Sequence, residues 1–228
     1  MKLRIKQYFD IDDNTNKLLF LLLAADLAFV LIHLFYMAGI LESVLFSVEK
    51  DKGYAEFYQY TKELWIILLL SIIAIKEKRI VYISWAALFF YFLLDDSFRV
   101  HEQLGEFLVN YFGFHGIFNL RAQDFGELAV SAVFGVLLFS FIGWAYLFST
   151  NHERKISHNI FLLACSLVFF GVVVDVAHVA IPWGGQVFGL IEDAGEMVIV
   201  SIMVWYLFGL KFAAEESSPS PAVEQQTS

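Results

Sequence analysis

Acidic residues and histidines recur inside stretches that are otherwise apolar, and two of these groups have spacings suited to metal binding. Asp175 and His178 are three residues apart and Glu192 and Glu196 are four apart, so on helices each pair shares a face. A carboxylate near a histidine on one helix, joined by carboxylates from neighbouring helices, is how helix bundles build di-metal sites. Imidazole and carboxylate together suit zinc, iron or manganese. The pattern predicts a bound divalent metal.

A third group lies in FLLDDSFRVHEQLGE, residues 92–106, which continues an apolar run. We expect its charged residues to lie on the last turns of a membrane helix. Ionisable groups at that depth are costly and need a partner or a function. Asp95 and Arg99 are four residues apart and are most simply interpreted as an ion pair. His101 follows as a further candidate metal ligand.

The predicted site therefore has two sets of residues. The candidate metal ligands are His178, Asp175, Glu196 and His101, and the candidate catalytic or additional coordinating groups are Glu192, Asp95 and Glu127. A bound ion would offset the repulsion among these carboxylates and could activate water, or oxygen if the metal is iron. The plainer interpretations are a structural polar network and, for Glu127, a favourable position at the start of a helix.

Heights counted along each predicted helix place these residues at a similar depth. At about 1.5 Å per residue from the cytoplasmic end, Glu196 and Asp95 fall at roughly 22 and 24 Å. Asp175, His178 and Glu127 fall at roughly 26, 30 and 31 Å. Because each helix was counted separately, the agreement predicts one polar pocket in the outer third of the membrane.

Composition identifies the surroundings of this pocket. The chain has 228 residues, of which 59% are hydrophobic and 17% are charged. Soluble domains are about 45–50% apolar and about 25% charged, so the chain is predicted to be an integral membrane protein of one domain. Its net charge of −9 gives no reason to expect nucleic-acid binding. Cys165 is the single cysteine and cannot form an internal disulfide.

The apolar runs predict an all-α polytopic membrane protein, a bundle of six transmembrane helices. The predicted spans are 18–41, 63–75 extended by 58–61, 80–101, 125–148, 159–181 and 187–210. Each can cross about 30 Å of hydrocarbon when its flanks are included. Helices are expected rather than strands because the runs are continuous and backbone groups must be satisfied internally.

The positive charges predict the orientation. Lys and Arg concentrate in the short segments KEKR (76–79) and NHERK (151–155), which places both termini in the cytoplasm. The expected location is the cell membrane, as a cell inner membrane protein. Lys62 is then assigned to an outside segment. We expect a cytoplasmic arm at 1–17, the transmembrane domain at 18–211 and a disordered cytoplasmic tail at 212–228. Residues 105–123 are expected to form an interfacial or re-entrant loop over the polar pocket.

The favoured function is a metal-dependent enzyme acting on a lipid-like or small substrate from the bilayer. The alternatives are a proton- or metal-ion-coupled transporter or channel, a haem-binding bundle that uses two of His33, His101 and His178, and a non-catalytic membrane partner or sensor. Transport is weakened because Asp26 is the one ionisable residue predicted in the inner half. The sequence leaves the metal, the substrate and the oligomeric state open.

Overall fold

The described part of the chain is helical throughout. The structure is a computed structural model that describes residues 13–113, 115–116, 121–174, 176 and 185–216. Within those residues there are seven α-helices and no strands. The predicted all-α class is therefore correct for the part of the chain that can be assessed.

Five helices are long and apolar enough to cross a membrane, which indicates a multi-pass membrane protein. They are α2 (Asp13–Met37), α3 (Tyr54–Glu77), α4 (Ile80–Phe98), α6 (Ala122–Leu147) and α7 (Asn151–Val168) with its continuation η2 (Phe169–Val174). The predicted span 187–210 lies within α9 (Gly185–Glu216), which is not among these five. Six spans and the orientation of the termini therefore stay predictions.

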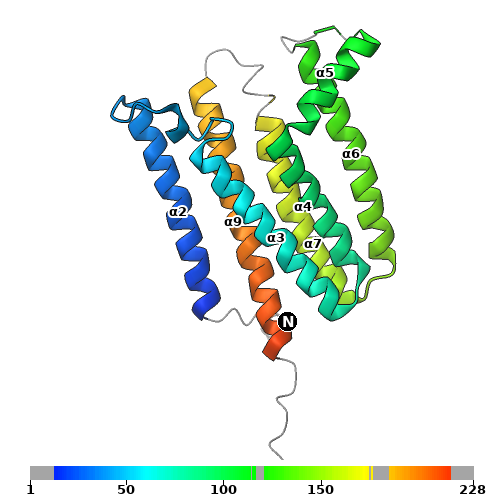
Figure 1. The fold of residues 1–228 in the computed structure, drawn as a ribbon. Coiled ribbons are helices and arrows are strands. Elements are labelled where there is room, and N and C mark those ends of the chain that lie inside the picture. Colours follow the sequence, from blue (N-terminus) through cyan, green and yellow to red (C-terminus); the bar gives the residue numbers. More distant parts are fainter. Residues whose placement is uncertain (1–12, 114, 117–120, 175, 177–184, 217–228) are drawn as a thin grey trace, which may run out of the picture.

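The helices lie side by side, with α2 and α6 at opposite edges (Figure 1). Helix α9 packs against α2, α3 and α7, and α3 packs against α4. Helix α6 packs on α4 and on the short helix α5 (Val100–Phe112). The core between these helices is apolar and contains the buried side chains of Ile66, Trp85, Phe89 and Leu207.

The predicted span 80–101 is not one continuous helix, so its predicted outer end was wrong. Helix α4 ends at Phe98, and Arg99 adopts a left-handed conformation with φ of 53° before α5 begins. Residues other than glycine rarely adopt this conformation. Here a short ion pair between Arg99 and Glu102 holds the side chain, while Asp95 accepts from a main-chain N–H on the far side of the break. Residues 105–112, predicted to be part of a loop, belong to α5.

Two glycines let α5 approach α6 closely. A Cβ atom on Gly105 would lie 2.7 Å from the main-chain nitrogen of Glu127, and one on Gly126 would overlap the carbonyl oxygen of Gly105. The two backbones are therefore in direct contact. This contact holds the helix that carries His101 against the helix that carries Glu127.

A buried ion pair ties α2, α3 and α9 together. Lys62 is 0% exposed, and its Nζ lies 2.9 Å from Asp26 Oδ1. The same nitrogen donates to the carbonyl of Met197 and to Ser201 Oγ, and Ser201 in turn donates to Asp26 Oδ2 at 2.7 Å. The assignment of Lys62 to an outside segment was therefore wrong. Its charge is tolerated inside the bundle because Asp26 and two oxygen acceptors surround it.

Candidate functional site

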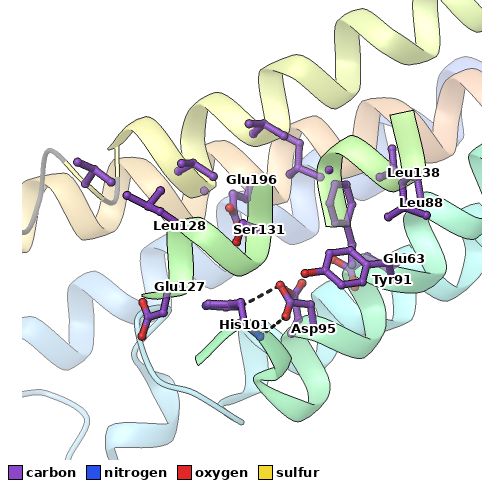
Figure 2. Close-up of a pocket in the computed structure, with 18 of the residues that line it drawn as sticks. Glu63, Leu88, Tyr91, Asp95, His101, Glu127, Leu128, Ser131, Leu138 and Glu196 are labelled. Atoms are coloured by element: carbon purple, nitrogen blue, oxygen red, sulfur yellow. Dashed lines mark hydrogen bonds and ion pairs between the residues drawn. The ribbon is translucent and has the colours of Figure 1, made fainter. Parts of the chain in front are cut away.

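A cavity of about 330 Å³ opens between α3, α4, α6, η2 and α9 beneath α5. Six carboxylates line it, from four of the long helices: Glu63, Asp95, Asp96, Asp124, Glu127 and Glu196. His101 lies between Glu127 on one side and the Asp95 and Tyr91 side chains on the other (Figure 2). So many acids around one space create strong mutual repulsion unless protons or cations offset it.

Glu63 is the most deeply buried of these acids, with an exposed fraction of 1%. The carboxyl groups of Asp96 and Glu196 line the same cavity, and their negative charges act on Glu63. The second oxygen, Oε2, has no hydrogen-bond partner among the described residues. Neighbouring buried carboxyl groups must share a proton or bind a cation to offset their repulsion, and a buried oxygen without a partner costs about 1–3 kcal/mol. This position is thus one where a cation would be stabilising.

Asp95 holds His101 at the rim of the cavity. The main-chain N–H of His101 donates to Asp95 Oδ1 at 2.7 Å, and ring Nδ1 donates to Oδ2 at 2.8 Å. Burial lowers the pKa of His101, but the hydrogen bond with Asp95 and the charges of Asp95, Glu127 and Glu102 outweigh it and raise the pKa. Nδ1 is thereby used, and Nε2 makes no hydrogen bond to any described residue. The ring is oriented for proton transfer or ligation through Nε2.

A π-helical turn makes room for Glu196. The turn is η2, and Gly171 within it lines the cavity. A Cβ atom on Gly171 would overlap Glu196 Oε1, so only glycine leaves space for this carboxylate. Turns of this kind are rare and frequently occur at functional sites.

The remaining polar groups at the mouth are engaged with one another. Arg121 Nη2 lies 2.7 Å from Asp124 Oδ1, and Gln123 Nε2 donates to Glu127 Oε1 at 2.9 Å. Gln123 also donates to the carbonyl of Glu102 on α5. The Arg121 charge is therefore already paired with one of the six carboxylates.

A second, smaller cavity of about 130 Å³ adjoins the first. Gln59, Asp96 and Glu196 line both cavities. Its other acidic lining residues are Glu49, Asp51, Glu56 and Asp193. We call this space the acidic vestibule. It extends the negative surface from the first cavity toward the end of the bundle that carries η1 (Val44–Phe46).

Four of the seven site residues named from sequence share the first cavity: Asp95, His101, Glu127 and Glu196. Glu192 lies on α9 but lines neither cavity. Asp175 and His178 lie outside the described residues. The structure thus brings together residues of α4, α5, α6 and α9, while their proposed chemical roles stay untested.

Two further interpretations can be compared with the structure. Arg99 pairs with Glu102 and approaches Asp51 at 3.6 Å, so its predicted pairing with Asp95 was wrong. His33 lies outside both cavities, where its Nδ1 is 3.3 Å from both Ser47 Oγ and the nitrogen of Val48. His33 and His101 therefore do not face a common space as a haem-ligand pair would.

Sequence reasoning missed Glu63 as a site residue. It was treated as the start of a short apolar span, although α3 begins nine residues earlier, at Tyr54. Its depth along the helix is the signal that could have identified it. Glu63 lies about 21 Å along α3 from Glu77, at about 1.5 Å per residue, which is the depth found for the other acids.

Among the described residues, no three His, Cys, Asp or Glu side chains are arranged to hold a metal ion. The structure therefore shows an acidic cavity with an oriented histidine, not a formed metal centre. The searches of curated proteins and of solved structures returned no match to the chain. Residues 18–212 match a domain of unknown function (DUF8692), and the chain belongs to this family.

Proposed function

We propose that the protein binds a divalent cation at Glu63, Asp96 and Glu196 and uses it in an enzymatic reaction on a lipid-like substrate. The observation that carries the proposal is Glu63, whose buried Oε2 lacks a partner among the described residues while two other carboxyl groups lie beside it. A cation would take the place of the proton between Glu63 and Asp96 and satisfy the remaining oxygen. Three acids from three helices then become ligands rather than repelling neighbours.

Binding must draw the ligands together, because the described side chains are not yet spaced as a three-donor site. The sequence-predicted ligands Asp175 and His178 would complete the coordination. Val172 and Val176, which flank position 175 in the chain, both line the cavity. An oxygen-rich donor set favours manganese or iron over zinc.

Two features of the site support chemistry in addition to binding. His101 is oriented by Asp95 and keeps Nε2 available, as a general base beside a bound ion requires. The acidic vestibule supplies a negatively charged route by which a cation would reach Glu196. The ion, when bound, would activate water as a Lewis acid, and His101 would accept the released proton through Nε2.

Transport is less well supported by the geometry. The cavity meets apolar side chains at its inner end, including Leu88, Leu138 and Phe139. The neighbouring charges Lys62 and Asp26 are engaged with each other and with Ser201, so they do not extend the acidic cavity inward. A closed inner end suits a site that reacts or binds rather than one that conducts.

Metal analysis of purified protein tests the proposal. Protein in detergent is loaded with Mn²⁺, Fe²⁺ or Zn²⁺, desalted, and assayed for bound metal by mass spectrometry. We expect wild-type protein to retain metal and Glu63→Gln and Glu196→Gln to lose affinity by about 10-fold or more. Glu106→Gln, at an exposed acid on α5, is the matched control and should bind as wild type does.

Folding must be monitored in the same samples. Glu63→Gln removes repulsion inside the bundle, so its unfolding temperature should not fall, and lost metal cannot then be ascribed to unfolding. Wild-type protein that retains none of the three metals would overturn the proposal. Metal retention by Glu63→Gln equal to that of wild-type protein would overturn the assignment of Glu63 as a ligand.

A further inference from the structure

The acidic vestibule has carboxylates of its own, which the cation site proposed above does not use. Helices α3 and α9 begin at the same end of the bundle and pack against each other (Figure 1). The segment between η1 and α3 reaches the same space, so three parts of the chain contribute acids to it. These acids are Glu49 and Asp51 from the connecting segment, Glu56 from α3 and Asp193 from α9.

A glycine brings Glu49 close to Asp193. A Cβ atom on Gly189 would lie 2.7 Å from Glu49 Oε1, so the Glu49 carboxylate rests against the backbone of α9. Gly189 and Asp193 are four residues apart and share a face of that helix. Neither Glu49 nor Asp193 forms a hydrogen bond or an ion pair with another described residue. The two carboxylates therefore lie about one helical turn apart, and the negative charge of Glu49 acts on Asp193.

The cationic side chains near the vestibule do not neutralise these two acids. Lys50 lines the vestibule, but it is exposed and forms no ion pair with a described residue. Arg99 is paired with Glu102 and approaches only Asp51, at 3.6 Å. The charges of Glu49 and Asp193 are therefore not offset by any side chain that the structure describes.

A buried amide oxygen faces the same difficulty. Gln59 lines the vestibule as well as the first cavity and is only 7% exposed. Its Oε1 atom has no hydrogen-bond partner among the described residues. Amide and carboxylate oxygens are all acceptors, so Gln59 Oε1, Glu49 and Asp193 do not satisfy one another. A cation satisfies all three together.

The donor set indicates which cation fits. Ca²⁺ binds carboxylates, amide carbonyls and water in flexible geometry, whereas Mg²⁺ demands a near-ideal octahedron. Glu49, Gln59 and Asp193 provide oxygen alone, from a connecting segment and two helices. Two carboxylates balance the charge of one divalent ion. Because only two donors are acids, the site does not require the group of three metal-binding side chains that is absent from the described residues.

We infer that the acidic vestibule is a second cation site, which binds Ca²⁺ through Glu49, Gln59 Oε1 and Asp193, with water completing the coordination. The inference goes beyond the proposed function, because none of these residues is a ligand of the first cation. In the predicted orientation the site lies on the outer side of the membrane. Calcium sites of extracellular modules have dissociation constants of about 10⁻⁴–10⁻³ M, and we expect a similar value here.

Calcium titration of purified protein tests this inference. Metal-stripped protein in detergent is titrated with Ca²⁺ from about 10⁻⁵ to about 10⁻² M, and bound Ca²⁺ and unfolding temperature are measured. We expect saturable binding and a rise in unfolding temperature as the site fills. Asp193→Asn and Glu49→Gln should each weaken binding by about 10-fold or more. Glu42→Gln, at an exposed acid that lines neither cavity, is the matched control and should bind as wild type does.

Two substitutions of Gln59 separate calcium binding from folding. Gln59→Leu removes the amide oxygen and should weaken Ca²⁺ binding. Gln59→Glu adds a charged donor at the same place and should strengthen Ca²⁺ binding by about 10-fold, because calcium affinity rises with the charge of the ligands. A gain in affinity is not a result of a damaged fold.

Measuring retained Mn²⁺, Fe²⁺ and Zn²⁺ in the same variants separates the two sites. Glu63→Gln should keep Ca²⁺ binding, and Asp193→Asn should keep the metal of the first site. No Ca²⁺ binding up to about 10⁻² M, equal affinity for Mg²⁺, or unchanged binding in Asp193→Asn or Gln59→Leu would overturn the inference. Calcium binding that is lost in Glu63→Gln alone would place the ion in the first cavity and do the same. Calcium binding as expected, in protein that retains none of the other three metals, would overturn only the proposed function.

Discussion

Asp95 binds His101 through both of its carboxylate oxygens, at 2.7 Å to the main-chain nitrogen and 2.8 Å to ring Nδ1. The pair bridges the break at Arg99 and joins the end of α4 to the start of α5. One carboxylate thus serves two purposes, since it caps a helix and fixes the orientation of the histidine at the cavity.

This pair makes stability depend on pH. The raised pKa of His101 means that the folded state holds the proton more tightly than the unfolded state. The stabilisation is therefore fully present below the unfolded pKa of about 6.5 and is lost as the pH rises through the higher folded value. We expect the unfolding temperature, relative to that of His101→Gln, to decrease across this window. Thermal unfolding in detergent from about pH 5 to about pH 9 measures it.

Asp95→Asn is the control for that experiment. It removes the charge that favours protonated His101 and should reduce the pH dependence. A wild-type profile parallel to that of His101→Gln over the whole range would contradict the assignment of the effect to His101.

Removing only one partner of the buried ion pair between Lys62 and Asp26 should lower the stability of the protein strongly. Lys62→Met leaves Asp26 buried without its counter-ion, and we expect a loss of about 3–5 kcal/mol in the free energy of unfolding. Removing both charges in Lys62→Met with Asp26→Leu should recover much of the loss, because no uncompensated charge is left. A double-mutant cycle by denaturant unfolding measures the coupling. Additive losses would show that the two charges do not interact as the structure indicates.

Gly171→Ala should change metal affinity without changing the stability of the fold. The new methyl group meets the end of the Glu196 side chain, which can rotate away, so we expect little change in unfolding temperature. The carboxylate would leave its place in the cavity, and metal affinity should fall by about 10-fold or more. Bound-metal analysis compares the variant with Gly143→Ala, whose methyl group would have no atom within 4 Å. Unchanged metal affinity would argue against Glu196 as a ligand.

Gly126→Ala should instead weaken the fold, because its methyl group meets the carbonyl of Gly105, which cannot rotate away. We expect a loss of about 1–3 kcal/mol in unfolding free energy as α5 is pushed off α6. Hydrogen exchange of the α5 amides should increase in parallel. Gly143→Ala on the same helix is the control and should be neutral or slightly stabilising. Protection of α5 equal to wild type would show that the glycine contact is dispensable.

The sequence by itself determined the helical class and the apolar segments, because a segment that crosses hydrocarbon must satisfy its own backbone and be apolar over its length. It also predicted that Asp95, Glu127 and Glu196 lie at one depth, since rise per residue along a helix is constant. These three now line one cavity.

Only the tertiary structure decided which side chains from different helices contact one another in the cavity and in the core. The break at Arg99 depends on hydrogen bonds that form after α5 folds back, and nothing in the composition of 92–106 marks it. Lys62 is buried because Asp26, 36 residues away in the chain, faces it from another helix. Glu63 is a site residue for the same reason, since its neighbours Asp96 and Glu196 come from two other helices. Contacts between distant segments follow from packing, which local sequence pattern does not encode.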